Sequence, residues 1–292
     1  MAQITVATTL YPMKDAWVNA FAEALAAAMG GRDCEAVVAL DGIGPDAAAR
    51  LLQPLAASAP LCFVEAAGAP ATVRTAMLRA AQSREAEATI LVDADDLPLP
   101  DAIDSHCRAL AHGDVSFGDM LVIDEDGRLD GTCFFAGSTI ASRVSGGSAL
   151  ERVNFMGLTN TALGARALAA IDREPPADIA AYDWWLFRSL LEAGFVAART
   201  DRPVTRYRDR RDAVLGARPD PRRFAKRCRM VAAQGRAFAN RPESVRYGAA
   251  ADRLAEQVGA EPARFADRIA AACAEPGVWF ADVDRLVTGG AA

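Results

Sequence analysis

Short apolar runs alternate with longer segments of helical pattern through the first hundred residues of the chain. We predict strands over residues 4–8, 35–40, 61–65 and 88–92, and helices over residues 15–29, 45–57 and 69–82. Strands that alternate with helices of this length are typical of β-α-β units, which build a mostly parallel sheet. The pattern therefore predicts an α/β fold in which a mostly parallel, mixed sheet is flanked by helices.

The pattern is weaker in the middle of the chain. We predict a helix over residues 101–112, a strand and turn over residues 115–123, and a turn over residues 124–127 that joins antiparallel strands. A helix over residues 180–193 should end at Gly194, and Thr205-Arg-Tyr207 should continue a strand from Val196. The segment 131–147 is rich in Gly, Ser and Thr, so we expect a mobile loop or lid there.

From Pro219 onward the pattern is helical, with breaks before Pro242, Pro262 and Pro276. We therefore predict a division into an α/β unit over residues 1–216 and a helical C-terminal region over residues 217–292.

The fourth predicted strand is followed at once by three carboxylates, Asp93, Asp95 and Asp96. The carboxyl ends of parallel strands are where open α/β sheets bind their ligands. If the backbone stays extended, Asp93 and Asp95 point to the same side, and their oxygens suit a hard divalent cation or a ribose. The alternative is an Asp-rich turn that caps the next helix.

The helix over residues 180–193 places Asp183 in its first turn, next to Trp184 and Trp185. A carboxylate in an aromatic-walled and partly dry site can accept a proton from an attacking hydroxyl. The helix dipole also favours an aspartate at this position, and both indoles are compatible with a role in the core.

The net charge of −6 is unevenly distributed along the 292 residues. Twelve basic residues and only three aspartates fall between Arg202 and Arg236. A basic segment in an acidic protein indicates an anionic ligand or a membrane surface with acidic lipids. A peripheral membrane contact through residues 218–236 is therefore one interpretation, and a solvated helix face is the other. We expect no nucleic-acid partner.

The six cysteines are widely spaced and include no Cys-x-x-Cys pair, which argues against a zinc site and a disulfide framework. The sequence shows no signal peptide and no apolar run of about 18 residues. We expect a cytoplasmic protein, with a peripheral position at the inner membrane face as a further option.

Six segments together resemble family-two glycosyltransferases with the GT-A fold, and most closely the rhamnosyltransferase-like members. The resemblance covers residues 3 to 216 and rests on the order and spacing of the segments, since each one alone is weakly specific. They are Thr8-Thr-Leu-Tyr11, Leu40-Asp-Gly42, Arg74, Val92-Asp-Ala-Asp-Asp96, Tyr182-Asp-Trp-Trp185 and the segment 207–216.

The resemblance implies transfer of a sugar from a nucleoside-diphosphate sugar to an acceptor hydroxyl, with inversion, as in polysaccharide biosynthesis. Asp183 matches the catalytic base. Asp95 matches the residue that holds Mg²⁺ or Mn²⁺ on the diphosphate, with Asp93 beside it near the ribose. The other implied donor contacts are Thr8, Tyr11, Asp41, Arg74 and Arg210, and the implied acceptor side is formed by Thr159, Asn160, Trp184 and Trp185. A helix start explains Thr159 and Asn160 equally well.

Four positions, in three segments, depart from the family pattern. Arg210 and Ala213 occupy the positions of a His and an Asn near the end of the catalytic domain, Tyr182 replaces a His before Asp183, and Pro12 replaces an Asn. A guanidinium cannot bind a metal ion. We therefore predict that Arg210 contacts the diphosphate directly and partly replaces the metal charge.

Two other functions compete with this interpretation. A nucleotidyltransferase that makes an activated sugar would share the sheet and the acidic cluster, but it normally needs a Gly-rich basic turn after the first strand, which residues 8–14 lack. A non-catalytic nucleotide-sugar-binding scaffold would explain Arg210 and Ala213 as lost chemistry. The sequence does not identify the sugar, the base, the acceptor or the oligomeric state.

Overall fold

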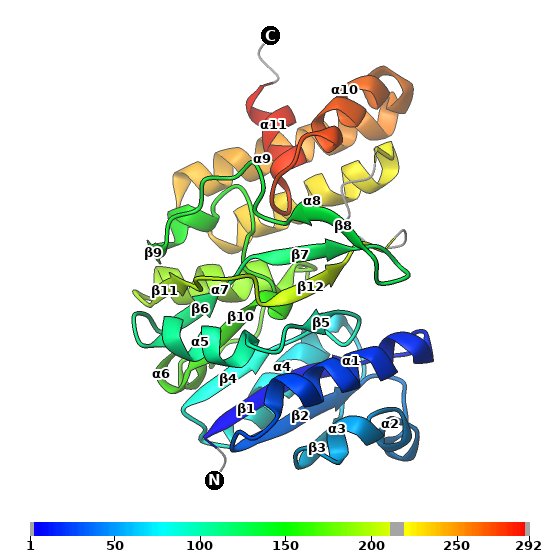
Figure 1. The fold of residues 1–292 in the computed structure, drawn as a ribbon. Helices are drawn as coiled ribbons and strands as arrows, with labels where there is room; N and C mark the ends of the chain where they lie inside the picture. The colour runs from blue at the N-terminus through cyan, green and yellow to red at the C-terminus, as the bar shows by residue number, and fades with distance from the viewer. Residues whose placement is uncertain (1–2, 211–218, 290–292) are drawn as a thin grey trace.

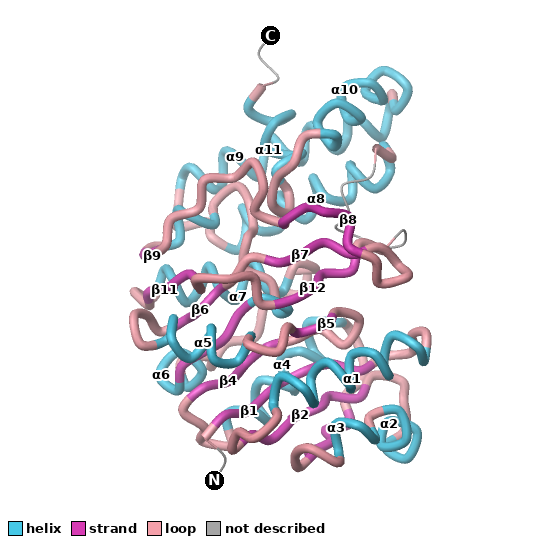
Figure 2. Tube along the Cα trace, viewed as in Figure 1, coloured by secondary structure: helices cyan, strands magenta, loops and turns pink. Residues whose placement is uncertain are grey.

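The computed structural model describes residues 3–210 and 219–289. It contains a large mixed sheet with helices on both faces, a smaller sheet beside it, and a helical C-terminal region (Figures 1 and 2). The large sheet has the order β3 (Leu61–Glu65), β2 (Cys34–Leu40), β1 (Ile4–Leu10), β4 (Ala88–Leu91), β10 (Thr161–Gly164), β6 (Val115–Phe117), β11 (Val196–Arg199) and β9 (Arg143–Ser145). The α/β fold expected from the sequence is confirmed.

Strands β1 to β4 are parallel to one another, as the alternation of strands and helices predicts. Strand β10 is antiparallel to both β4 and β6, and it makes the sheet mixed. The sequence prediction missed β10 because its four residues, Thr161-Ala-Leu-Gly164, are too few to show a period.

Helices cover the two faces of the large sheet. One group contacts α1 and consists of α1 (Asp15–Met29), α2 (Pro45–Leu51), α3 (Gln53–Ala56) and α5 (Ala102–Leu110). The other group contacts α4 and consists of α4 (Pro70–Gln82), α6 (Ala165–Ala169) and α7 (Tyr182–Glu192). Adjacent side chains of a strand point to opposite faces, so Val6 packs in the core under α1 while Ala7 packs in the core under α4 and α7.

The smaller sheet has the order β5 (Leu97–Pro98), β12 (Thr205–Arg208), β7 (Met120–Ile123) and β8 (Leu129–Cys133). The predicted turn over residues 124–127 joins the antiparallel strands β7 and β8. The prediction that Thr205-Arg-Tyr207 continues the strand from Val196 is wrong, because β11 and β12 belong to different sheets. Asp201-Arg-Pro203 separates them, and proline has no N–H for a sheet hydrogen bond.

Two further predictions are corrected. The helix expected over residues 45–57 is divided at Leu52 into α2 and α3, where Pro54 cannot donate a backbone hydrogen bond. The segment expected to be a mobile loop or lid holds part of β8 and all of β9, and β9 pairs with β11. This pairing fixes the second half of the segment to the large sheet. Two 3₁₀ turns, Gly147–Leu150 and Leu158–Asn160, complete this region.

The C-terminal region contains α8 (Pro221–Ala237), α9 (Pro242–Ala260), α10 (Pro262–Ala274) and α11 (Ala281–Thr288), so the breaks predicted before the prolines are confirmed. Its core is continuous with that of the α/β unit. The Trp184 ring on α7 lies 4.5 Å from the Phe280 ring, and the Phe134 ring lies 4.5 Å from that of Trp279. No described helix is long and apolar enough to cross a membrane.

Candidate functional site

Polar residues gather where the parallel strands end. Strands β1, β2 and β4 are followed by Tyr11, Asp41 and Asp93, and β3 ends at Glu65. Because parallel neighbours end on the same side, these residues lie along one edge of the sheet, the position at which α/β proteins bind ligands.

The three acids after β4 have different environments. Asp96 is 1% exposed, and its Oδ1 accepts a hydrogen bond from the backbone N–H of Arg208 over 2.7 Å. Burial raises its pKa well above the ordinary value. Asp93 and Asp95 are half-buried and remain at the surface of the edge. Asp96 therefore joins β4 to β12, while Asp93 and Asp95 are placed to meet a ligand.

Asp93 lies between a cation and other acids. Its Oδ1 is 3.9 Å from a terminal nitrogen of Arg74 on α4. Burial raises the pKa of Asp93 to about 6, although Arg74 opposes the rise, and the charges of Asp95 and Asp183 add to it. Two residues that were far apart in the sequence, Asp93 and Asp183, thus influence each other across one site.

Asp95, Tyr11 and Arg210 form a hydrogen-bonded group. The Arg210 guanidinium lies 3.0 Å from Oδ2 of Asp95 and donates to the Tyr11 hydroxyl over 2.8 Å. The Tyr11 hydroxyl lies 3.3 Å from the same carboxylate oxygen, and burial followed by the charge of Asp95 raises the pKa of Tyr11. Arg210 therefore neutralises the carboxylate that was expected to hold the metal ion.

Asp183 stands in the first turn of α7 and is 8% exposed. Its Oδ2 accepts a hydrogen bond from Nδ2 of the buried Asn154 over 3.1 Å. Burial raises the pKa of Asp183, while the charge of Arg74, the first backbone N–H groups of α7 and the Asn154 amide lower it. A desolvated carboxylate whose orientation is fixed by an amide has the properties of a general base.

Asn154 is itself held by the C-terminal region. Its backbone N–H donates to the Trp279 carbonyl over 3.0 Å, and its Oδ1 accepts from the Met156 N–H over 3.0 Å. Trp279 packs against Phe134 and, edge to face, against Tyr207. The loop between α10 and α11 thus supports the residue that orients Asp183.

The residues expected on the acceptor side are mostly buried. Asn160 uses its side chain within the protein, donating to the carbonyls of Gly118 and Phe155 and accepting from the Gly157 N–H. The indole of Trp184 donates to the Leu150 carbonyl over 2.6 Å in the core. Thr159 is 1% exposed, and its carbonyl accepts from the Thr205 hydroxyl. The polar side-chain atoms of Asn160 and Trp184 are therefore already used in hydrogen bonds within the protein.

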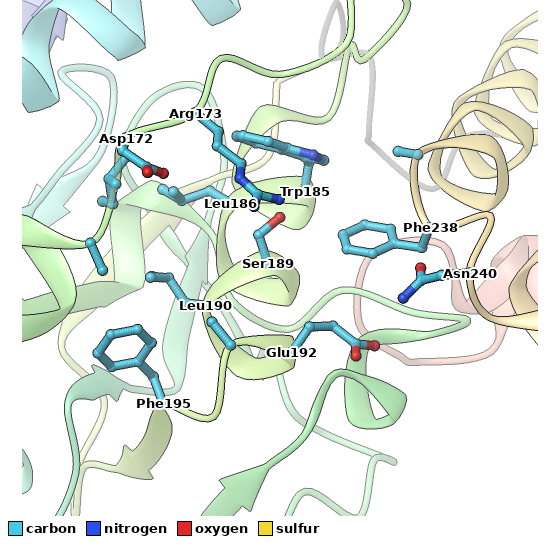
Figure 3. Close-up of a pocket in the computed structure, with 14 residues that line it drawn as sticks. Asp172, Arg173, Trp185, Leu186, Ser189, Leu190, Glu192, Phe195, Phe238 and Asn240 are labelled. Atoms are coloured by element: carbon cyan, nitrogen blue, oxygen red, sulfur yellow. The ribbon is translucent and has the colours of Figure 1, made fainter.

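Trp185 faces away from Asp183, because residues two apart on a helix differ by about 200°. It lines a pocket of about 490 Å³ with Ser189, Glu192, Phe238 and Asn240, between α7 and the end of α8 (Figure 3). The pocket is therefore separate from the edge that holds Asp93 and Asp95.

The remaining expected donor contacts lie at the ends of β1 and β2. Thr8 is buried in β1, and its hydroxyl has no hydrogen-bond partner among the described residues. Asp41 follows β2, and its backbone N–H donates to the Leu10 carbonyl over 2.9 Å. Asp41 therefore lies at the same edge of the sheet as Asp93, whereas Thr8 lies inside β1 and Arg74 reaches Asp93 from α4.

The side chains fit a divalent cation only if it shares its coordination with a diphosphate. Among residues 3–210 and 219–289, no group of three or more His, Cys, Asp or Glu side chains is placed to hold a metal ion. Mg²⁺ is commonly held by one or two carboxylates plus substrate phosphates. Asp95, with Asp93 nearby, is suited to hold a cation that is also bound by phosphates. These two side chains are too few to hold a metal ion without such a ligand.

The basic segment is only partly a surface feature. Arg227 lies in the segment 218–236, which was expected to form a membrane contact or a solvated helix face, but it is buried and paired with Asp282, 2.5 Å away. The core ion pair joins α8 to α11. Arg222, Lys226 and Arg229 are exposed and follow one another along one side of α8. Ala213 and the rest of the segment 211–218 lie outside the described residues.

The sequence prediction missed Asn154, Arg208 and Trp279. Arg208 donates from its backbone to Asp96 and from Nε to the Asp95 carbonyl over 2.8 Å. For Asn154 a signal existed, since it is the polar residue in the otherwise apolar run Val153-Asn-Phe-Met156. For Trp279 none existed, because its role depends on a contact across more than a hundred residues.

No protein-family model matches the chain, and no curated protein sequence matches it. Solved structures do. The structure of S. aureus TarS 1–349 in complex with UDP-GlcNAc has a TM-score of 0.58 at 16% identity, over 86% of this chain and 70% of that one. The mannosyltransferase PcManGT from Pyrobaculum calidifontis, in complex with GDP-Man and Mn²⁺, has a TM-score of 0.53 at 17% identity, over 99% and 79%.

Glucosyl-3-phosphoglycerate synthase from M. tuberculosis is similar at a TM-score of 0.50 and 12% identity, over 82% of this chain and 81% of that one. At these identities the likeness establishes a shared fold. The fold is the GT-A-like fold expected from the sequence, and one of these structures is that of a mannosyltransferase.

Proposed function

We propose that the protein is a glycosyltransferase that moves a sugar from a nucleoside-diphosphate sugar to an acceptor hydroxyl. The observation that supports this proposal most strongly is the position of Asp93 and Asp95 just after β4, with the guanidinium groups of Arg74 and Arg210 at 3.9 Å and 3.0 Å from them. The charge of Asp183, at the start of α7, adds to the rise in the pKa of Asp93. The site thus combines a donor-side acid at the strand ends with a buried base across from it.

The fold likeness agrees with this class of donor. TarS was solved with UDP-GlcNAc and PcManGT with GDP-Man and Mn²⁺, so nucleotide sugars are the ligands of proteins that share this fold. For this chain the proposed donor contacts are Thr8, Tyr11 and Asp41 toward the nucleoside, and Arg74 with Asp93 toward the ribose and phosphates.

The diphosphate is proposed to bind at Asp95 and Arg210. Mg²⁺ or Mn²⁺ held by Asp95, with Asp93 beside it, would stabilise the negative charge that develops on the leaving diphosphate. The Arg210 guanidinium, 3.0 Å from Asp95, provides a second positive charge at the same place. A guanidinium forks onto phosphate oxygens, so Arg210 reduces the need for the metal ion.

Asp183 is proposed to take the proton of the acceptor hydroxyl as the hydroxyl attacks the anomeric carbon from the face opposite the diphosphate. This geometry inverts the anomeric configuration, and the transition state is oxocarbenium-like. The resemblance to rhamnosyltransferase-like sequences points to a hexosyl or deoxyhexosyl donor. Of the acceptor-side residues, the buried Thr159, Asn160 and Trp184 are proposed to shape the wall rather than to contact the acceptor, and Trp185 lines the separate pocket.

The exposed cations Arg222, Lys226 and Arg229 lie along one side of α8. We propose that they bind a membrane surface that carries a lipid-linked acceptor. Such a row attracts anionic lipid headgroups at about 1 kcal/mol per cation near the surface. Co-sedimentation with phosphatidylserine vesicles tests whether a lipid-linked acceptor is compatible with this surface. Loss of binding in a variant with all three cations replaced by glutamine is expected, and equal binding of that variant would contradict the extension.

A thermal-shift screen tests the donor site. Nucleoside diphosphates and nucleotide sugars are added with and without Mn²⁺ to the wild type, to Asp95→Ala and to the control Asp267→Ala, which alters an exposed acid on α10. A ligand that binds the native state raises the unfolding midpoint. Stabilisation of the wild type and the control, with a smaller effect of Mn²⁺ on Asp95→Ala, is expected. If no nucleotide stabilises the wild type, the proposal is wrong.

A further inference from the structure

Trp17 lies among cations near the end of β1. It stands in the first turn of α1, and its side chain is half-buried. Three cations approach its ring: the Lys14 ammonium at 4.4 Å from the ring centroid, the Arg208 guanidinium at 5.1 Å and the Arg210 guanidinium at 6.0 Å. A cation within about 6 Å of an indole centroid is attracted by the negative face of the ring. The ring therefore draws together positive charges that would otherwise repel one another.

The Trp17 ring is fixed by a hydrogen bond to the turn between β7 and β8. Its Nε1 donates to the Glu125 carbonyl over 3.1 Å, and Nη1 of Arg208 donates to the same carbonyl over 3.0 Å. The Nε of Arg208 also donates to the Asp95 carbonyl over 2.8 Å. Trp17 and Arg208 thus connect α1 to the backbone of the residue that is proposed to meet the diphosphate.

Arg208 and Arg210 reach the ring from the same side of one extended segment. Arg208 ends β12, and the Asp209 N–H continues the pairing with β7 by donating to the Ile123 carbonyl over 2.9 Å. Residues two apart on an extended backbone point to the same side. The guanidinium of Arg208 donates to backbone carbonyls, whereas that of Arg210 lies 3.0 Å from the Asp95 carboxylate. Arg210 is therefore the arginine of this pair that is placed to meet a phosphate.

We propose that Trp17 is a positioning residue that orders the Arg210 guanidinium for the diphosphate; the inference rests on the proposed function. An arginine side chain has several rotatable bonds, and ordering them on binding costs free energy. Contact with a fixed indole face restricts the side chain before the ligand arrives, so less of that cost opposes binding. Trp17 acts through Arg210 and does not contact the nucleotide. Its ring should matter most when no metal ion shares the charge of the diphosphate.

Isothermal titration of GDP, UDP and ADP, each in chelator and with Mn²⁺, tests this role without any acceptor or turnover. Trp17→Leu and Trp17→Phe both lose the indole N–H, and only Trp17→Phe keeps an aromatic face. The matched control is Phe265→Leu, which removes a ring on α10 with Arg264 and Arg268 at 6.0 Å and 5.8 Å from its centroid.

In chelator we expect Trp17→Leu to bind nucleoside diphosphate about fivefold more weakly than the wild type, the effect of one cation–π contact. Trp17→Phe and Phe265→Leu should bind nearly as tightly as the wild type. With Mn²⁺ the loss in Trp17→Leu should become smaller. Equal affinities of Trp17→Leu and Trp17→Phe in chelator would overturn the inference, because the aromatic face would then have no role.

A double-mutant cycle shows whether Trp17 acts through Arg210. In a chain that already carries Arg210→Ala, the further change Trp17→Leu should not weaken binding in chelator. An equal loss in both backgrounds would mean that Trp17 supports the site as a whole, and the inference would be wrong.

The outcomes separate this inference from the proposed function. If none of the three nucleotides binds to the wild type with or without Mn²⁺, the proposed function fails and the inference fails with it. If the wild type binds nucleotide only with Mn²⁺, the proposed function stands and the role of Trp17 is wrong. Unfolding midpoints of the apo proteins show that the variants fold, and Trp17→Met takes the place of Trp17→Leu if the leucine variant does not.

Discussion

The Arg210 guanidinium lies 3.0 Å from the carboxylate of Asp95, the residue that the Asp-x-Asp pattern assigns to a metal ion. A positive charge that belongs to the chain therefore sits where a divalent cation would bind. The charge of Arg210 can therefore balance part of the negative charge of a bound diphosphate.

We expect the wild type still to bind nucleoside diphosphate, with a reduced affinity, when metal is removed with a chelator. In Arg210→Ala, the affinity without metal should fall by about tenfold or more, because a charged hydrogen bond is lost, and Mn²⁺ should restore much of it at the freed Asp95. Arg206→Ala, an exposed arginine on the same segment, serves as control. Equal affinity of Arg210→Ala and wild type in chelator would refute the role of Arg210.

Asp183→Asn should abolish turnover and preserve donor binding. Proton transfer by a positioned base contributes about 10²- to 10⁴-fold in rate, and an amide of the same shape cannot accept the proton. Turnover of a nucleotide sugar and titration with the nucleoside diphosphate give the two readouts, with the exposed Asp172→Asn as control. A non-catalytic scaffold would show no difference between Asp183→Asn and the wild type in either measurement.

Asn154→Ala should move the acidic limb of the pH–rate profile to higher pH. The Asn154 amide lowers the pKa of Asp183, whose pKa burial has already raised. Without the amide the pKa rises further, so the base is protonated and inactive at a higher pH. The profile of kcat against pH is the measurement, and the exposed Asn19→Ala on α1 is the control. An unchanged limb with a uniformly lower rate would indicate a purely structural role.

Asp93→Asn should stabilise the protein at neutral pH and not in acid. Burial raises the pKa of Asp93 to about 6, so between about pH 4 and pH 6 the folded state binds more protons than the unfolded state. Stability therefore falls as the pH rises through this window, and the penalty is complete above it. The amide has no such penalty.

The difference between the unfolding midpoints of Asp93→Asn and wild type should thus grow from pH 4 to pH 7. Each kcal/mol gained corresponds to roughly 2 °C in a protein of this size. The exposed Asp172→Asn should show no pH-dependent difference. A constant offset at all pH values would show that the ionisation of Asp93 does not control stability.

Gly157→Ala should destabilise the protein and lower turnover. A Cβ at this position would lie 2.4 Å from the Trp279 ring, which must then move away from Asn154. Gly259→Ala is a matched control, because a Cβ there meets no atom within 4 Å and alanine favours the helix. Thermal unfolding should show a lower midpoint only for Gly157→Ala, and a midpoint equal to that of the control would mean that Trp279 relaxes freely.

The parallel half of the sheet was predictable because its strands are continuous apolar runs and its helices show a clear period. The edge with Asp41, Asp93 and Asp95 followed from it, since the ends of parallel strands meet. The features that could not be predicted depend on contacts between residues that are far apart in the sequence. The strand β10 is too short to show a period, the partner of Asp183 is a single asparagine, and the burial of Trp184 and Asn160 follows from packing. We had expected Trp184 and Asn160 to contact the acceptor because of their positions in family motifs, and such a position does not indicate whether a side chain is exposed.

The Trp279 carbonyl holds the backbone of Asn154, and Asn154 orients Asp183. The C-terminal helices are therefore not an exchangeable module. A chimera that replaces them with the end of another protein of this fold would also have to replace the residue at position 154. A nick in the loop between α10 and α11 would remove the support of Asp183 while leaving the strand ends with Asp93 and Asp95 intact.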